Sequence, residues 1–239
     1  MTRLQRAGTA AATVMIAGAL LLTGCNSLTN ASPSRVVQSA PEQSVAPRTE
    51  DLPTSAELEA ALLNADDLGG TFTESPPGSD SPTTGASEPS FTGCRLLADL
   101  LNTSDGDPEQ KQASATFEGA GISVSETLTA LPATLMDPAY TVARKALSSC
   151  GSISYVSANE RIDFELTPIH FGGPDSIGVR MDGAYLGTQV NGYLLIERLG
   201  KNVVMGYVFF QAAGGSSQVA SAYYRLAIAT ARESLGLNG

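Results

Sequence analysis

The sequence predicts an α+β fold, with a largely antiparallel sheet, helices packed on one face of it, and a single domain. Two observations predict this class. Strand patterns follow one another through the second half of the chain, whereas helical patterns are confined to its start, middle and end. No stretch between residues 54 and 239 has the composition of a linker between domains.

The composition argues against a nucleic-acid-binding protein. The chain of 239 residues has 14 basic and 24 acidic side chains and no basic cluster. Binding to phosphates needs Lys and Arg to displace counterions. A hydrophobic content of 42%, with no tryptophan, allows a packed core built mainly from aliphatic residues and alanine.

The N-terminus has the pattern of an export signal. Arg3 and Arg6 precede a short apolar run over residues 7–22, which ends in Leu22-Thr23-Gly24-Cys25. A bilayer span needs about 20 apolar residues, and a short run followed by small residues is typical of a signal peptide. The last four residues resemble the bacterial lipobox, which implies cleavage after residue 24 and a diacylglycerol thioether, with palmitate-type acyl chains, on Cys25. An uncleaved anchor helix with an incidental cysteine is the alternative.

Residues 25–53 are expected to form the lipidated N-terminus and a flexible tether. They carry Pro33, Pro41, Pro47 and Pro53 among polar residues, a composition that cannot bury enough surface to fold. A coil of this length has a root-mean-square reach of about 30 Å. Cleavage removes two of the 14 basic residues and no acid, which leaves a net charge of −12. Lipid rather than charge must therefore hold the mature protein at an anionic membrane.

The predicted domain, residues 54–239, begins with helical patterns. Thr54 and Glu57 fit a capping box, and the helix that they open is expected to end at Gly69-Gly70. A long loop over residues 75–92 follows, and a short helix over residues 93–101 completes this part.

Strand patterns and two further helices make up the rest of the domain. Asp137-Pro138 is a typical helix start, and Gly151 is a typical helix end. The last helix is expected over residues 217–235, with Gly214-Gly215-Ser216-Ser217 as the loop that caps it. Strands are expected over residues 113–118, 122–131, 152–157, 161–168, 177–181, 190–199 and 202–212.

The chain has three cysteines, and the lipobox resemblance assigns one of them, Cys25, to lipidation. An exported chain with two remaining cysteines, Cys94 and Cys150, most simply forms one disulfide. A redox or nucleophilic pair is the other interpretation, but the CxxC spacing is absent. Two distant cysteines and one histidine do not make a zinc site, and we expect no metal and no cofactor.

The sequence offers little catalytic chemistry, and we expect a non-enzymatic protein. His170 is the only histidine, and a hydrolase would use it as the base with Asp175 as its orienting acid. No Gly-x-Ser-x-Gly elbow supplies a nucleophile. The short acidic groups Asp66-Asp67 and Asp105-Gly106-Asp107 fit a helix end and a turn better than a calcium site.

The strand pattern over residues 202–212 is apolar on both faces. It is either a central strand covered on both sides or a strand with one face lining an apolar cleft, near Tyr193 or Tyr185. The second interpretation predicts Tyr193, Met205, Tyr207 and Phe209 as ligand-binding residues. One face carries Val203, Met205, Tyr207 and Phe209, and the other carries Val204, Val208 and Phe210.

Several short motifs resemble actinobacterial exported sensor-type domains, of the kind found outside the membrane on PknH-type serine/threonine kinases and as free-standing lipoproteins. The resemblance covers about residues 54–237 and implies an α+β domain with a cleft on one side of its sheet. Members related to the kinases often have two disulfides, whereas this chain can form one. The motifs are Leu62-Leu63-Asn64-Ala65-Asp66-Asp67-Leu68, Cys94-Arg95-Leu96-Leu97, Ala115-Thr116-Phe117, Val124-Ser125-Glu126-Thr127-Leu128 and Cys150-Gly151.

Together these features predict a lipoprotein on the extracytoplasmic face of the cell membrane. Its expected function is non-catalytic binding or sensing of a ligand that is lipidic or derived from the cell wall. The alternative is a module that binds another protein of the cell envelope through its acidic surface and the loop over residues 75–92. A hydrolase that uses His170 is the third hypothesis.

Overall fold

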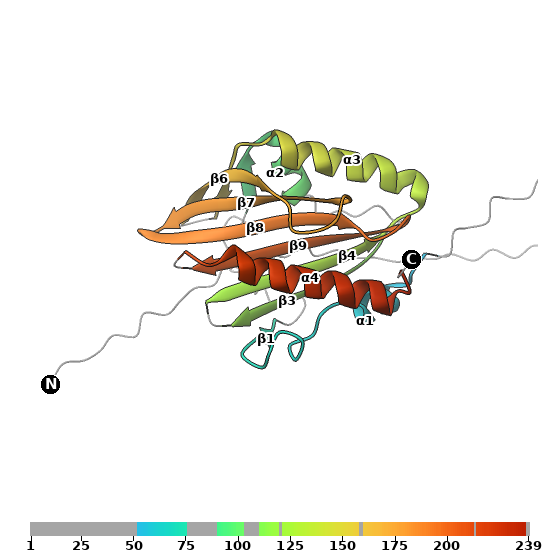
Figure 1. Ribbon diagram of the computed structural model, residues 1–239. Coiled ribbons are helices and arrows are strands. Elements are labelled where there is room, and N and C mark those ends of the chain that lie inside the picture. Colours follow the sequence, from blue (N-terminus) through green and yellow to red (C-terminus); the bar gives the residue numbers. More distant parts are fainter. Residues whose placement is uncertain are drawn as a thin grey trace, which may run out of the picture.

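The computed structural model describes residues 52–75, 90–102, 110–119, 121–157, 160–212 and 214–237. Nine strands form one antiparallel sheet in the order β1-β3-β4-β9-β8-β7-β6-β5-β2 (Figure 1). The predicted α+β class, the antiparallel sheet and the single domain are confirmed. The strands are β1 (Thr73–Glu74), β2 (Ser90–Gly93), β3 (Lys111–Gly119), β4 (Ile122–Ala130), β5 (Ser152–Val156), β6 (Arg161–Ile169), β7 (Ser176–Tyr185), β8 (Thr188–Arg198) and β9 (Val203–Ala212). The helices are α1 (Ser55–Ala60), α2 (Arg95–Asn102), α3 (Ala133–Ser149) and α4 (Ser217–Ser234).

Strand β9, whose sequence is apolar on both faces, is an interior strand of the sheet, next to the middle strand β8. Strands β5 to β9 follow one another as a meander, and β4 joins the hairpin β3–β4 to β9, with Ile122 opposite Gln211 and Ala130 opposite Val203. The seven strands expected from the sequence are all present, whereas the two short edge strands β1 and β2 were not expected. Strand β2 occupies the end of the predicted loop over residues 75–92, and residues 76–89 of that loop lie outside the described residues.

The expectation that the helices pack on one face is wrong, because helices cover both faces. Helices α1 and α4 pack on one face through Leu58 and Tyr224, in the same cluster as Tyr207. Helices α2 and α3 pack on the other through Leu97 and Leu147. We call these the α4 face and the α3 face. In Figure 1, α4 crosses in front of the sheet and α2 lies behind it. Both faces need cover because β8 and β9 carry apolar residues at odd and even positions alike.

Two helix boundaries differ from the sequence expectation. Helix α1 starts at the predicted capping box, in which the Glu57 N–H donates to the Thr54 hydroxyl at 3.2 Å and the Thr54 N–H donates to the Glu57 carboxylate at 2.7 Å. It ends at Ala60, well before the predicted glycine pair. Helix α3 begins at Ala133, so Pro138 lies inside it. Asp137 does not cap this helix, because its carboxylate pairs with the Arg198 guanidinium of β8 at 2.6 Å.

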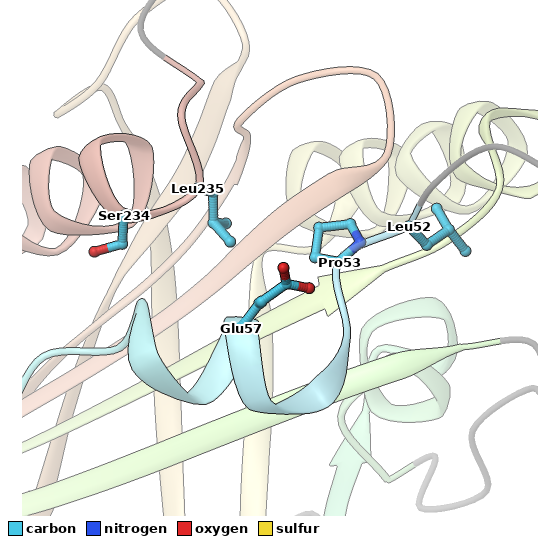
Figure 2. Close-up of a pocket in the computed structure, with 5 residues that line it drawn as sticks. All are labelled: Leu52, Pro53, Glu57, Ser234 and Leu235. Carbon is cyan, nitrogen blue, oxygen red and sulfur yellow. The ribbon is translucent and has the colours of Figure 1, made fainter.

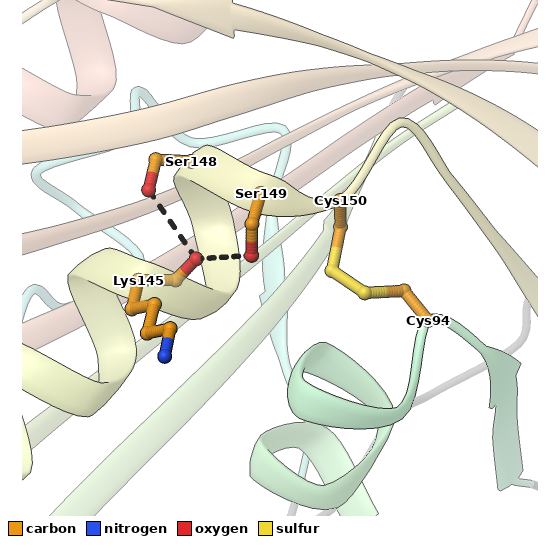
Figure 3. The surroundings of a disulfide bond; sticks show 5 residues. All are labelled: Cys94, Lys145, Ser148, Ser149 and Cys150. Carbon is orange, nitrogen blue, oxygen red and sulfur yellow. Dashed lines mark hydrogen bonds between the residues drawn. A yellow bond between two sulfur atoms is a disulfide. The ribbon is translucent and has the colours of Figure 1, made fainter.

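The predicted disulfide is present and joins the residue before α2 to the residue after α3. Cys94 and Cys150 are bonded, with their Cα atoms 5.8 Å apart (Figure 3). The hydroxyl groups of Ser148 and Ser149 donate to the Lys145 carbonyl at 3.3 and 2.6 Å, so the last turn of α3 is ordered beside the bond. The disulfide therefore fixes α2 and α3 to each other on the α3 face.

The β2 edge of the sheet is closed by a side chain. The Asn102 amide accepts a hydrogen bond from the Phe91 N–H and donates one to the Phe91 carbonyl, both at 2.7 Å. These two groups point away from β5, so the amide takes the place of a further strand. Unpaired edge groups are a template for pairing with other chains, and this amide removes that template at Phe91.

One carboxyl group lies in the core beneath α1. Glu126 of β4 is fully buried on the α4 face, opposite Tyr207 of β9. One of its oxygens accepts the Leu63 N–H at 3.0 Å, and the other has no hydrogen-bond partner among the described residues. Burial, assisted by the nearby Asp67 carboxylate and opposed by the Leu63 N–H, raises the pKa of Glu126 to about 8.

Candidate binding face

The four residues predicted to bind a ligand lie together, but in the closed core. Tyr193, Met205, Tyr207 and Phe209 each have a relative exposure of 0% and share the α4 face. The Tyr207 ring packs edge-on against Tyr224 of α4, with ring centres 5.4 Å apart, and its hydroxyl donates to the Ala220 carbonyl at 3.2 Å. A ligand could reach these side chains only by displacing α4.

Tyr185, which the sequence pattern also places near the expected cleft, does not belong to this cluster of buried residues. It lies at the end of β7, and its hydroxyl donates to the Glu160 carboxylate. Hydrogen bonding to a carboxylate, together with burial, raises the pKa of this hydroxyl.

The α3 face of strand β9 is more accessible. Val204, Val208 and Phe210 of β9 are half-buried. The helices that pack closest to β3, β4 and β9 are α1 and α4, which both lie on the α4 face. The α3 face of these three strands therefore carries side chains that the described helices leave partly accessible. Sequence periodicity marked β9 as apolar on both sides, but it could not show which side α4 would cover.

A small apolar groove lies where this surface meets α2. Its volume is about 30 Å³, enough for about one water molecule, and no polar atom lines it. The end of α2 and the edge strand β2 form one side of it, and strands β7, β8 and β9 form the other. The lining residues are Phe91, Leu101, Met181, Leu194, Val208 and Phe210.

Hydroxyl groups border the groove residues of β9 on the other side. The hydroxyl pairs Ser114–Thr127 and Thr116–Ser125 each bridge β3 and β4 with an oxygen–oxygen distance of 3.0 Å. Ser125 lies directly opposite Val208 in the sheet. The side chains of Val204, Val208 and Phe210, which we call the apolar strip, thus run beside these four hydroxyl groups, which we call the hydroxyl row. We call this combination of the groove, Val204 and the two hydroxyl pairs the open face.

Two glycines shape the floor of the open face. A Cβ atom at Gly192 would lie 2.5 Å from the Phe210 ring, so the glycine lets that ring lie flat across β8. A Cβ atom added at Gly206 would meet nothing closer than the Cβ atom of Thr127, at 3.9 Å, so this glycine leaves a shallow hollow beside the hydroxyl row.

A larger pocket, of about 310 Å³, lies where the described chain begins (Figure 2). It is lined by Leu52 and Pro53, by Glu57 of α1 and by Ser234 and Leu235 at the end of α4. Figure 2 shows the Glu57 carboxylate pointing into the space between Pro53 and Leu235. That carboxylate already accepts hydrogen bonds from the Thr54 N–H and hydroxyl, which lower the pKa of Glu57. The pocket offers no other ionisable side chain.

A buried polar network joins α4 to β7 and β8. The Tyr224 hydroxyl donates to the Glu197 carboxylate at 2.6 Å and lies 2.8 Å from the Ser176 hydroxyl. The Arg232 guanidinium pairs with the same carboxylate at 3.0 Å. Burial and the hydrogen bond to Glu197 raise the pKa of Tyr224. A Cβ atom at Gly172 would lie 2.3 Å from that carboxylate, so the network fills its own space and leaves no room for a substrate.

The residues of the hydrolase hypothesis do not form a catalytic arrangement. His170 and Asp175 are both exposed, and no hydrogen bond joins them. Ser216 caps α4, as predicted, by accepting the Gln218 N–H at 3.1 Å. Within the described ranges, no group of three acidic, histidine or cysteine side chains is placed to hold a metal ion.

The expected lipidation residue, Cys25, and the tether up to residue 51 lie outside the described residues. Across the part of the chain that the structure describes, no helix is both long and apolar enough to span a bilayer. A scan against protein-family models finds no match to this chain, and a search of curated proteins finds none.

Proposed function

We propose that this protein is a lipid-anchored binding or sensor-type domain on the extracytoplasmic face of the cell membrane, without catalytic activity, and that its ligand lies on the open face. The observation that carries the proposal is the asymmetry of β9. Met205, Tyr207 and Phe209 are sealed on the α4 face, whereas Val204, Val208 and Phe210 are half-buried on the other side. The lipid anchor itself rests on the lipobox pattern that ends in Cys25.

The chemistry of the open face favours a neutral, amphipathic ligand. The residues that line the groove are apolar, and the neighbouring pairs Ser114–Thr127 and Thr116–Ser125 offer hydroxyl groups only. An acyl chain would gain free energy by covering the apolar strip, while glycerol or sugar hydroxyl groups would find partners in the hydroxyl row. A lipid or a cell-wall component with such a headgroup fits both halves.

A second candidate function is the binding of another envelope protein. The small volume of the groove, about 30 Å³, favours this candidate, because an enclosed small-molecule site is commonly about ten times larger. A protein partner needs only a complementary surface, which the open face could supply without a deep pocket.

Substitution of one valine by glutamate tests the open face. Val208→Glu places a charge in the apolar strip, and the control Val142→Glu places the same charge on the outer side of α3, where Val142 is 53% exposed. The probe is N-phenyl-1-naphthylamine, a neutral dye that fluoresces in apolar sites, displaced by monopalmitoylglycerol. We expect Val208→Glu to weaken both binding and displacement by at least about tenfold, and Val142→Glu to leave them unchanged.

Near-ultraviolet circular dichroism and thermal unfolding would show that both variants are folded. If Val208→Glu unfolds the domain, Gly206→Leu provides a second test, because it fills the shallow hollow without adding charge. Equal binding by the wild type and by folded open-face variants would overturn the ligand-binding proposal. Absence of dye binding by the wild type, with an envelope protein that crosslinks to the open face, would support the second candidate.

A further inference from the structure

Three connections meet at the end of the sheet that lies opposite α1. They are the β3–β4 turn, the β7–β8 turn and the junction between β9 and α4. The strand pairing brings them together. The Ala212 N–H at the end of β9 donates to the Gly121 carbonyl of the β3–β4 turn at 3.2 Å, and Ala212 lies opposite Val190, near the start of β8. In Figure 1 the β7–β8 hairpin projects from this end, and α1 and the C-terminus lie at the other. We call this region the hairpin end.

The hairpin end is nearly free of charge, although the chain as a whole is acidic. The segments 119–125, 183–193 and 211–217 contain no charged residue. Charged groups flank these segments. Glu118 precedes Gly119, the Asp182 carboxylate accepts a hydrogen bond from the Asn191 amide and pairs with Arg180 at 2.8 Å, and Glu160 accepts one from the Tyr185 hydroxyl. The opposite end carries the pair Asp137–Arg198 together with further ionisable groups. The three connections of the hairpin end therefore add no negative charge of their own when they approach an anionic surface.

The tip of the β7–β8 hairpin places a leucine where it has no packing role. Leu186 is 88% exposed, the highest value among the large hydrophobic residues that the structure describes, and its φ angle of 49° lies in the left-handed region. Gly187 follows with φ of 80°, so both tip residues have the positive φ of a two-residue hairpin turn. Asn, Asp or Gly at position 186 would relieve the strain that a leucine has there. Backbone strain at an apolar residue that is 88% exposed is not offset by burial within the domain and indicates an external contact.

The surroundings of Leu186 favour a lipid surface over a protein. Tyr185 beside it has an apolar ring and a hydroxyl held by Glu160, the combination typical of residues at a membrane interface. On the α3 face, Val190 and Phe210 continue the apolar strip of the open face toward this tip. The remaining connections at this end contain glycine and serine, which offer no pattern of charges for a protein partner to read.

We infer that the hairpin end is a membrane-contact surface and that Leu186 inserts into the outer leaflet of a bilayer. The inference rests on the proposed lipid anchor, because one leucine gives only weak attachment by itself. A lipid anchor would keep the bilayer at a high local concentration, so weak insertion suffices to orient the domain. In that orientation the open face adjoins the lipid from which an amphipathic ligand would come.

The absence of tryptophan from the chain makes a direct test possible. The full lipidated chain carrying Leu186→Trp, and a control carrying Val142→Trp, are each reconstituted into vesicles of phosphatidylcholine and phosphatidylglycerol. Some of the phosphatidylcholine is brominated and quenches fluorescence within the bilayer. We expect the tryptophan at position 186 to shift to shorter wavelength and to be quenched several-fold more strongly than the tryptophan at position 142.

Flotation of the vesicles separates this inference from the proposed anchor. If both variants float with the vesicles and neither tryptophan is quenched, the anchor stands and the membrane contact is overturned. If the chains do not float, the anchor fails and the inference fails with it. Specific crosslinking of residue 186 to an envelope protein, without quenching by lipid, would also overturn it.

A second variant separates insertion from stability. Leu186→Asn suits the left-handed tip, so we expect an unchanged or higher melting temperature. In a chain with Thr188→Trp as the reporter, Leu186→Asn should nonetheless reduce quenching by the brominated lipid. Unreduced quenching in this variant would show that Leu186 does not insert.

Discussion

The carboxyl group of Glu126 on β4 accepts the backbone N–H of Leu63 at 3.0 Å, across 63 positions of the sequence. This hydrogen bond holds the segment after α1 against the sheet. The helix ends before this point, because the N–H groups of Ala61 and Leu62 donate to carbonyls three residues back, at 3.1 and 3.3 Å. The buried acid therefore fixes the position of the chain just after the helix, while the capping box fixes its start.

The protonation of Glu126 makes stability depend on pH. Burial raises its pKa from the ordinary 4.5 to about 8, so the folded chain keeps a proton that the unfolded chain loses over that interval. Its contribution to stability is complete below about pH 4.5 and is lost as the pH rises toward 8, by at most about 1.4 kcal/mol per pH unit. We expect Glu126→Gln to remove this dependence and to be more stable than the wild type at pH 8.

Urea unfolding measured at several pH values between 5 and 8 would check this expectation. The same substitution at Glu165, which is exposed on β6, serves as the control and should preserve the wild-type pH dependence. A Glu126→Gln curve parallel to that of the wild type would show that the carboxyl group is ionised in the folded state.

The disulfide should make a large contribution to stability. Cys94 and Cys150 are 56 positions apart, and closing a loop of that length contributes about 4 kcal/mol in the chain-entropy model. We expect the double substitution Cys94→Ser, Cys150→Ser to lower the free energy of unfolding by about 2–4 kcal/mol. Unfolding of the wild type with and without reductant is the matching measurement. A change below about 0.5 kcal/mol would contradict the expected role.

Two adjacent tyrosines of α4 provide a matched pair. The Tyr224 hydroxyl belongs to the buried network with Glu197 and Ser176, whereas the Tyr223 hydroxyl makes only a 3.5 Å contact with the Leu68 carbonyl. We expect Tyr224→Phe to cost about 1–3 kcal/mol, because a buried carboxylate loses a donor. Tyr223→Phe should cost less than about 0.5 kcal/mol. Equal losses in thermal unfolding would contradict this account of the network.

The phenylalanines Phe209 and Phe210 distinguish the sealed face from the open face. Phe209 is fully buried beneath α4, and Phe210 lines the groove. We expect Phe209→Ala to cost about 3–5 kcal/mol and to abolish binding only through unfolding. Phe210→Ala should cost less and should weaken dye binding while the domain stays folded. If Phe209→Ala stays folded and loses dye binding while Phe210→Ala retains it, the binding site lies on the α4 face.

Patterns within a few residues predicted most of the fold. The alternation over residues 122–131 and 161–168 corresponds to β4 and β6, and the capping box starts α1 at the expected position. The pairing of Cys94 with Cys150 followed from the export signal and the cysteine count. Each of these features depends on residues close in sequence or on a count, and each is confirmed.

The errors come from contacts between distant residues. Asp137 reads as a helix cap, but its carboxylate pairs with Arg198, 61 positions later. The sequence predicts Tyr193, Met205, Tyr207 and Phe209 as ligand-binding residues because one face of a doubly apolar strand can line a cleft, and the structure buries that face beneath α4. Which face of β9 stays accessible depends on where α4 packs, and no local pattern contains that information.

The strand order has a consequence for how the chain acquires its structure. Strands β1 and β2 are neighbours among the strands of the sequence but occupy opposite edges of the sheet, and β4 pairs with β9, which lies near the end of the chain. The hairpin β3–β4 and the hairpins from β5 to β9 close over short loops, whereas β1, β2 and the β4–β9 pairing need partners distant in the sequence. During synthesis, the first half of the domain thus emerges before β9, which joins it to the rest of the sheet. A truncation that removed β9 would leave β3, β4 and α1 without a sheet to join.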